Sequence, residues 1–121
     1  MEYNKRTKIL FVDDMSVCCD IVMKGLSGKY SMCWTNTKQE ALQQINKNKY
    51  DLVITDFELG EDEPTGGLEV IKEAYKKHFP VVSISMANHR KEVEGLGLCK
   101  FIFKKEFFNN IEGVISDILN N

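Results

Sequence analysis

The sequence predicts an α/β fold built on a five-stranded parallel sheet with helices on both faces. Five short apolar runs of strand length alternate along the chain with five segments whose apolar residues recur at helical spacing. This alternation indicates parallel strands joined by right-handed crossovers. The run Leu52, Val53 and Ile54 is continuous and rich in β-branching, which is typical of a central strand covered on both faces.

The first half of the chain contributes two strands and two helices around this core. Residues 8–12 form the first apolar run, and helical spacing predicts a helix over residues 15–27. Large side chains at alternate positions in residues 30–35 predict a second strand. Thr37 and Glu40 have the spacing of a capping box, so a second helix begins there and leads to the central strand.

The second half of the chain continues the alternation after a polar, acidic and glycine-rich loop. The predicted elements are a loop over 58–67, a helix over 68–78, a strand over 81–85, a short helix over 87–96, a strand over 101–103 and a final amphipathic helix over 107–119. Pro80 marks one boundary, and two glycines weaken the short helix near its end.

Carboxylates follow two of the predicted strands directly. Asp13 and Asp14 come after the first strand, and Asp56 comes at the end of the third. Since open parallel sheets present their chemistry at the carboxyl ends of the strands, neighbouring strands would bring the three side chains together. Like charges at that distance need a compensating cation, and oxygen ligands suit Mg²⁺. Taken alone, Asp56 is equally well explained as the start of a turn or as a helix cap.

Composition excludes several other classes of protein. The length suits one domain, residues 1–121, and the net charge of −2 with intermixed Lys and Glu argues against a nucleic-acid surface. The four cysteines have no CxxC spacing and form no zinc pattern with the two histidines, so reduced thiols are expected. With no long apolar run and no signal peptide, the sequence predicts a soluble cytoplasmic protein that does not contact membranes.

Four segments together resemble the receiver domain of two-component response regulators, the CheY-like family. They are FVDD at 11–14, YDLVITD at 50–56, PVVSIS at 80–85 and FIFK at 101–104. The match extends over nearly the whole chain, with the motifs at four strand ends in the expected order. The resemblance implies a flavodoxin-like doubly wound fold with strand order 2-1-3-4-5 and five helices.

The resemblance also implies a phosphoryl acceptor and a metal site. Asp56 matches the phosphoacceptor, which takes its phosphoryl group from a sensor histidine kinase or a phosphotransfer protein. Asp14 matches the direct Mg²⁺ ligand, Asp13 holds the metal through water, and the backbone carbonyl of Glu58 matches the remaining protein ligand. Mg²⁺ is therefore the cofactor that the resemblance implies.

Three further residues match the switch of the family. Ser85 corresponds to the hydroxyl that moves to the phosphoryl group, Lys104 to the lysine that pairs with phosphoryl oxygens, and Phe101 to the aromatic that rotates inward on activation. The implied protein is a signalling switch that assists its own Mg²⁺-dependent phosphorylation and dephosphorylation without being a turnover enzyme. Its output passes to a downstream protein or an output domain.

The chain departs from the family pattern in three places. The loop after Asp56 is a few residues longer than usual, with Gly60 where proline is common, which affects geometry near the metal. Lys105 replaces a proline, so a cis peptide after Lys104 is not expected. The stretch between Ser85 and Phe101 is short, which shrinks the fourth helix.

Two rival functions and several simpler interpretations accompany this hypothesis. A phosphorylation-independent pseudo-receiver would share the fold, and a haloacid dehalogenase-type phosphatase also uses a strand-end aspartate, but it would require an aspartate where Glu58 stands. In isolation, Ser85, Lys104 and Phe101 would be ordinary structural residues. The cysteines are interpreted as packing residues, and His78 and His89 as surface residues.

Overall fold

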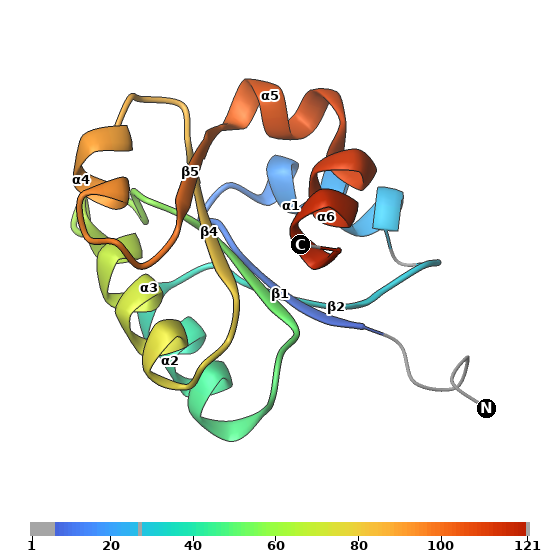
Figure 1. The fold of residues 1–121 in the computed structure, drawn as a ribbon, viewed down its shortest axis with the longest axis horizontal. Helices are drawn as coiled ribbons and strands as arrows, with labels where there is room; N and C mark the ends of the chain where they lie inside the picture. The colour runs from blue at the N-terminus through green and yellow to red at the C-terminus, as the bar shows by residue number, and fades with distance from the viewer. Residues whose placement is uncertain (1–6, 27, 121) are drawn as a thin grey trace.

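The computed structural model describes residues 7–26 and 28–120 (Figure 1). Its strands are β1 (Lys8–Val12), β2 (Ser31–Thr35), β3 (Leu52–Asp56), β4 (Val81–Ser85) and β5 (Lys100–Phe103). Its helices are α1 (Ser16–Leu26), α2 (Lys38–Lys47), α3 (Gly66–Lys76), α4 (Arg90–Glu94), α5 (Lys104–Asn109) and α6 (Ile111–Leu119). Ser27, the predicted end of the first helix, lies outside the described residues.

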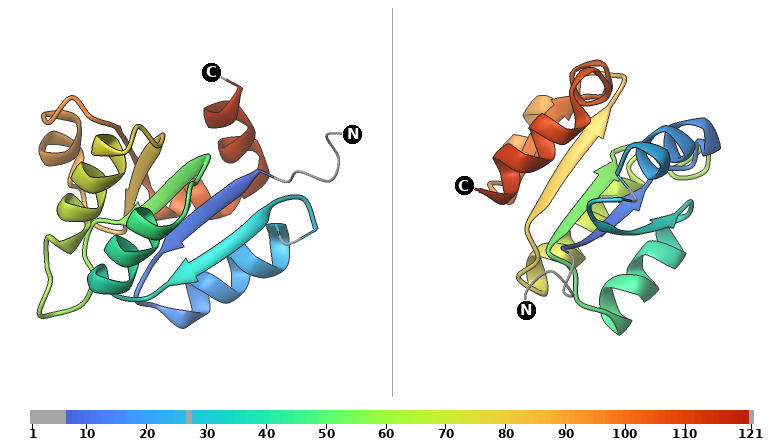
Figure 2. Two further views of the ribbon diagram at one scale, coloured as in Figure 1. Left: turned by 90° about the horizontal axis from the view of Figure 1, so that it is seen from below. Right: turned by 90° about the vertical axis from the view of Figure 1, so that its right-hand side faces the viewer.

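The five strands form one parallel sheet with the order β2-β1-β3-β4-β5, as predicted. Helices α1, α5 and α6 cover one face, and α2, α3 and α4 cover the other (Figures 1 and 2). The central strand β3 is buried at every position, which explains its continuous apolar sequence. Among the described residues, no helix combines the length and apolar character that a membrane span requires.

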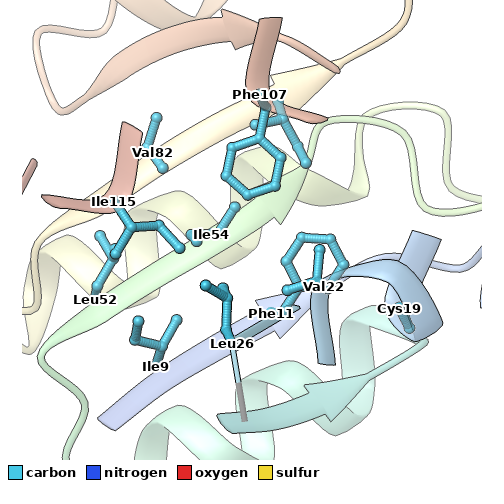
Figure 3. Close-up of a cluster of buried hydrophobic side chains, with 11 residues drawn as sticks. Ile9, Phe11, Cys19, Val22, Leu26, Leu52, Ile54, Val82, Phe107 and Ile115 are labelled. Atoms are coloured by element: carbon cyan, nitrogen blue, oxygen red, sulfur yellow. The ribbon is translucent and has the colours of Figure 1, made fainter. Parts of the chain in front are cut away.

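The core divides into layers because strand side chains alternate between the two faces. Ile9, Phe11 and Ile54 point to the face of α1, α5 and α6, where Phe11 stacks on Phe107 with ring centroids 6.2 Å apart (Figure 3). Leu10 and Val53 point to the opposite face, against α2 and α3. This two-sided packing holds β1 and β3 side by side and thereby fixes the distance between their carboxyl ends.

The C-terminal part differs from the predicted single helix. The chain enters α5 at Lys104, directly after β5, and breaks at Asn110 before α6 begins, so there are six helices in the described part of the chain and not five. Asn110 leaves the helical conformation, and its side-chain oxygen accepts a hydrogen bond from the Gly113 N–H at 3.2 Å. Asparagine is a favoured N-cap, so this residue begins a new helix inside the amphipathic pattern.

The other boundaries agree closely with the sequence. The Thr37 side chain accepts a hydrogen bond from the Glu40 N–H at 3.1 Å and caps α2, as the capping-box spacing indicates. Helix α4 is reduced to five residues, in line with the shortened stretch before Phe101. All peptide bonds of the described residues are trans, including the one between Lys104 and Lys105.

Candidate functional site

The sheet brings four predicted residues to one edge. Val12 pairs with Thr55, and Asp56 pairs with Ile84, so the ends of β1, β3 and β4 lie level with one another. The residues at or just beyond these ends are Asp13 after β1, Asp56 at the end of β3, Ser85 at the end of β4 and Lys104 after β5. The alignment of the parallel strands therefore brings these four residues together at the carboxyl ends of the strands.

The three aspartates form a compact group. Asp13, Asp14 and Asp56 each offer a carboxylate oxygen, and these oxygens all lie within 4.8 Å of one another. Asp13 and Asp56 are buried, whereas Asp14 is exposed. The Asp13 Oδ1 atom accepts the Met15 N–H at 2.9 Å, and the buried Oδ2 atom is contacted by the Lys104 ammonium at 2.9 Å. Three carboxylates this close together form a set of oxygen ligands that suits a cation.

Lys104 lies between the two buried carboxylates. Its Nζ atom is 2.8 Å from Asp56 Oδ2 and 2.9 Å from Asp13 Oδ2, and its side chain is only 3% exposed. Lys104 is therefore not a solvated lysine at a strand end. One ammonium leaves two of the three carboxylate charges uncompensated when all are ionised, and a divalent cation would balance them. The donor set consists of carboxylate oxygens, which fits Mg²⁺.

Burial and charge act on Asp56 in opposite directions. Burial raises the pKa of the Asp56 carboxyl, the Lys104 ammonium lowers it, and the Asp13 carboxylate raises it, with a net value of about 6. For Lys104, burial lowers the pKa, but the contacts with Asp56 and Asp13 outweigh it and the net direction is upward. The Lys104 ammonium thus stays charged at neutral pH, whereas the Asp56 carboxyl gains or loses its proton at a pH only slightly below neutral.

The long loop after β3 forms a compact turn over the site. Leu59 is buried, and its N–H donates to the Glu63 carbonyl oxygen at 2.9 Å. Gly60 has φ of 105°, a conformation closed to proline, and a Cβ placed on it would lie 3.8 Å from Asp14 Oδ2. A Cβ on Gly67 would lie 2.2 Å from the Asp56 carbonyl oxygen, so only glycine lets α3 approach the end of β3 so closely.

A cavity of about 420 Å³ opens above these groups. It is lined by Asp14, Met15, Asp56, Glu58, Gly60, Glu61, Pro64, Ser85, Met86 and Lys104. A larger groove of about 790 Å³ lies along β5 and α6, and its lining includes Glu94, Lys100, Glu106 and Asp117. Among the described residues, however, only Asp13, Asp14 and Asp56 form a group of three that could hold a metal ion. We therefore identify the smaller cavity as the functional one, because chemistry and not size distinguishes it.

The remaining predicted residues lie beside this cavity. The Ser85 Oγ atom is buried and accepts the Ala87 N–H at 3.1 Å. The Glu58 N–H donates to Asp56 Oδ1 at 3.2 Å, while the role of the Glu58 carbonyl as a metal ligand stays a prediction. Phe101 is buried against Phe57 and Val93, so its ring is directed inward in this structure.

Two residues near the site escaped the sequence analysis. The indole N–H of Trp34 on the edge strand β2 donates to the Asp13 carbonyl oxygen at 3.0 Å. His89, interpreted as a surface residue, stacks on Phe57 and contacts Glu58 and Glu92, with its side chain only 18% exposed. No local pattern signals the contacts of Trp34 with Asp13 or of His89 with Phe57 and Glu58, because they join residues far apart along the chain. Only the contact of His89 with Glu92 is local, at a separation of three residues.

Solved structures with the same fold are numerous. A CheY-like receiver domain protein of Methanospirillum hungatei superposes with a TM-score of 0.81 at 22% identity, covering 96% of this chain and 95% of that one. The response regulator TrrA of Thermotoga maritima, solved in complex with Mg²⁺ and BeF, superposes with a TM-score of 0.78 at 25% identity, covering 93% and 99% of the two chains.

Sequence comparison gives the same family. A two-component response regulator of Arabidopsis thaliana is 28% identical over 120 residues, and the transcriptional regulatory protein ZraR of Escherichia coli is 29% identical over 115 residues. These matches cover 94% and 92% of this chain but only 20% and 26% of those relatives. The family model of the response regulator receiver domain matches residues 9–116. Together with the acidic cluster and the sheet order, this match shows that the chain belongs to the response regulator receiver domain family.

Proposed function

We propose that Asp56 accepts a phosphoryl group and that the chain thereby works as a phosphorylation-controlled switch. The donor is a phosphohistidine on a sensor histidine kinase or a phosphotransfer protein. One observation carries the proposal above all: the Asp56 carboxylate lies in an open cavity while the Lys104 ammonium contacts it at 2.8 Å. A nucleophile and a fixed cation side by side are the two parts that phosphoryl transfer requires of a protein.

The reaction balances with the groups present. An ionised oxygen of Asp56 attacks the phosphorus atom, the P–N bond to the donor imidazole breaks, and the imidazole leaves with the electron pair and takes up a proton. The product is an acyl phosphate on Asp56. Lys104 is placed to pair with a phosphoryl oxygen, and it keeps its contact with Asp13 at 2.9 Å as an anchor.

The residues that would hold Mg²⁺ are Asp13, Asp14 and Asp56, with the Glu58 carbonyl as the further ligand. The convergence of three carboxylates, with the single Lys104 ammonium to balance them, supports this assignment. Bound Mg²⁺ supplies positive charge to the phosphoryl oxygens. Asp14→Ala should abolish Mg²⁺ binding, which the fluorescence of Trp34, the chain's one tryptophan, can report. Unchanged Mg²⁺ affinity in that variant would contradict the metal assignment.

The response to phosphorylation is assigned to Ser85 and Phe101. A phosphoryl group adds a charge of roughly −1.5 to −2 at Asp56, and the Ser85 hydroxyl would exchange its bond from Ala87 for one to a phosphoryl oxygen. Movement of Ser85 would then change the packing around Phe101, whose ring is already buried here. NMR of the ring with and without beryllofluoride tests this coupling, and identical spectra would contradict it.

A phosphoprotein partner would meet the exposed side chains around the cavity. Met15 and Met86 border the opening and are largely exposed, so they form an apolar rim around a charged centre. The protein that reads the phosphorylated state is a downstream protein or an output domain. The groove along β5 and α6 shares no lining residue with the acceptor cavity.

Acetyl phosphate with Mg²⁺ and intact mass measurement tests the proposal. One phosphoryl mass, labile to base, should appear on the native chain and be absent from Asp56→Asn. Equal labelling of both chains, or no labelling of the native chain under conditions that phosphorylate a control receiver, would favour the pseudo-receiver. Continuous release of phosphate from a generic phosphate ester would favour the phosphatase instead.

A further inference from the structure

His89 is a cation held between two carboxylates at the edge of the site. Its Nε2 atom lies 2.8 Å from Glu58 Oε2, and its Nδ1 atom lies 2.9 Å from Glu92 Oε2. The ring stacks on Phe57, with centroids 4.0 Å apart and the planes inclined by 16°. His89 precedes α4, so it joins that helix to the loop that follows the phosphoryl acceptor.

The two contacts define the charge of the ring. An ionised carboxylate only accepts hydrogen bonds, so each ring nitrogen must carry a proton to satisfy its partner. His89 is therefore an imidazolium in this arrangement, and it neutralises part of the charge of Glu58. The contact joins the residue before α4 to the loop after β3.

The position of Glu58 makes this neutralisation relevant to the acceptor. Glu58 lines the cavity over Asp56, and its N–H donates to Asp56 Oδ1. Asp14 and Glu61 line the same cavity, so its rim already carries acidic groups. A phosphoryl donor is an anion, and a free carboxylate of Glu58 at this rim would repel it.

We propose that His89 is a positioning residue for phosphoryl transfer, which holds the Glu58 carboxylate toward α4 and out of the path of the donor to Asp56. The inference rests on the proposed function, because it concerns the access of a donor to the acceptor. His89 touches neither Asp56 nor the donor. It acts through Glu58 and through the loop that carries Glu58.

A merely structural role for His89 predicts a different result. Loss of a structural contact would loosen the loop and weaken the binding of every ligand at the site. Release of the Glu58 carboxylate would instead oppose an anionic donor and favour a cation, because the local charge becomes more negative. The two measurements to compare are therefore the labelling rate with acetyl phosphate and the affinity for Mg²⁺.

The chain offers a matched control on the same loop. Lys38 at the start of α2 pairs with Glu63 at 3.2 Å and with Glu69 at 3.0 Å, and its side chain is 18% exposed, as is that of His89. Lys38 therefore anchors the opposite end of the loop through a comparable cation, but its partners do not line the cavity. Lys38→Gln tests what loosening the loop alone does.

The experiment measures both quantities at low ionic strength, with Mg²⁺ saturating in the labelling assay. His89→Gln should lower the labelling rate about fivefold and raise the Mg²⁺ affinity by about twofold. Glu58→Gln combined with His89→Gln should recover the labelling rate that His89→Gln alone loses, because the amide carries no charge to repel the donor. Lys38→Gln should leave both quantities within about twofold of the native values.

Each alternative outcome has a definite meaning. Native labelling with an unchanged rate in His89→Gln would overturn the inference and leave the proposed function intact. The inference would also fail if His89→Gln weakened both labelling and Mg²⁺ binding, if Lys38→Gln matched it, or if Glu58→Gln gave no rescue. Absence of labelling in the native chain would overturn the proposed function, and the inference with it.

Discussion

Lys104 and His89 are both cations placed between two carboxylates, but they belong to different environments. Lys104 and its partners Asp13 and Asp56 are 3%, 0% and 7% exposed, whereas Glu58 beside His89 is 49% exposed. Water screens the His89 pair strongly, and it hardly reaches the Lys104 pair. The same arrangement of charges therefore contributes to stability and chemistry in the interior and to positioning at the rim.

The difference also concerns what is lost when the cation is removed. Without Lys104, two buried carboxylates face each other with nothing to replace the ammonium. Without His89, the Glu58 carboxylate turns to water at little cost in free energy. Predictions that separate the two cases follow, beginning with the largest expected effect.

Removal of Lys104 should destabilise the fold strongly. We expect Lys104→Met to lower the free energy of unfolding by about 3 kcal/mol in metal-free buffer, because breaking a buried ion pair leaves an uncompensated charge. Added Mg²⁺ should restore part of the loss. Urea unfolding measures both effects, with the exposed neighbour Lys105→Met as the control. Equal unfolding midpoints for the two variants would contradict the comparison.

Neutralising Asp56 should stabilise the fold at neutral pH, whereas removal of Lys104 destabilises it. The pKa of Asp56 is about 6 in the folded chain, against 3.8 as its ordinary value, so the folded state binds more protons between these values. Stability conferred at low pH is therefore lost as the pH rises from about 4 to about 6, in total by roughly 3 kcal/mol.

The variant Asp56→Asn should remove this pH dependence. In metal-free buffer at neutral pH we expect it to be more stable than the native chain by about 1 to 3 kcal/mol, because an uncharged amide is less costly to bury. Urea unfolding at several pH values measures the profile, and the exposed Asp117→Asn is the control. A native profile that is flat, or that rises over this pH range, would be inconsistent with the burial of a charged Asp56.

The sequence predicted the buried group around Lys104 better than the exposed group around His89. Asp13, Asp56 and Ser85 follow strand runs, and in a parallel sheet such residues meet at one edge whatever the loops do. Lys104 follows the fifth strand as expected, but no sequence pattern indicated its burial, which arises because the chain enters α5 without a turn and carries the side chain over the site.

The exposed group around His89 depends on the conformation of the loop after β3, which short-range sequence patterns do not encode. The contact between His89 and Glu58 spans 31 residues, and it joins the start of α4 to the loop after β3. The break at Asn110 was missed for a related reason. The apolar stripe continues through both helices, and it conceals the capping role of a single asparagine.

Removal of His89 should affect stability far less than removal of Lys104. We expect His89→Ala to lower the free energy of unfolding by at most about 1 kcal/mol, since an ion pair with a half-exposed partner is weak. A double-mutant cycle with Glu58→Gln isolates the pair from the stacking on Phe57. A coupling energy between His89 and Glu58 as large as the loss of unfolding free energy in Lys104→Met would mean that burial does not explain the difference between the two cations.

The smallest expected effect is that of each cation on the reactivity of the Cys18 thiol. Burial raises the pKa of the Cys18 thiol, Asp13 raises it further, and the Lys104 ammonium lowers it. Alkylation requires the thiolate, so Cys18 should react more slowly in the folded chain than in the unfolded one. Lys104→Met should slow alkylation of Cys18 further, by about twofold, because one opposing charge is removed.

His89→Gln should leave the alkylation rate of Cys18 unchanged, because the His89 pair faces the rim and is screened by water. Mass spectrometry that resolves Cys18 from Cys19 at mildly alkaline pH measures the rates, and equal slowing in the two variants would show that the surface cation reaches as far as the buried one.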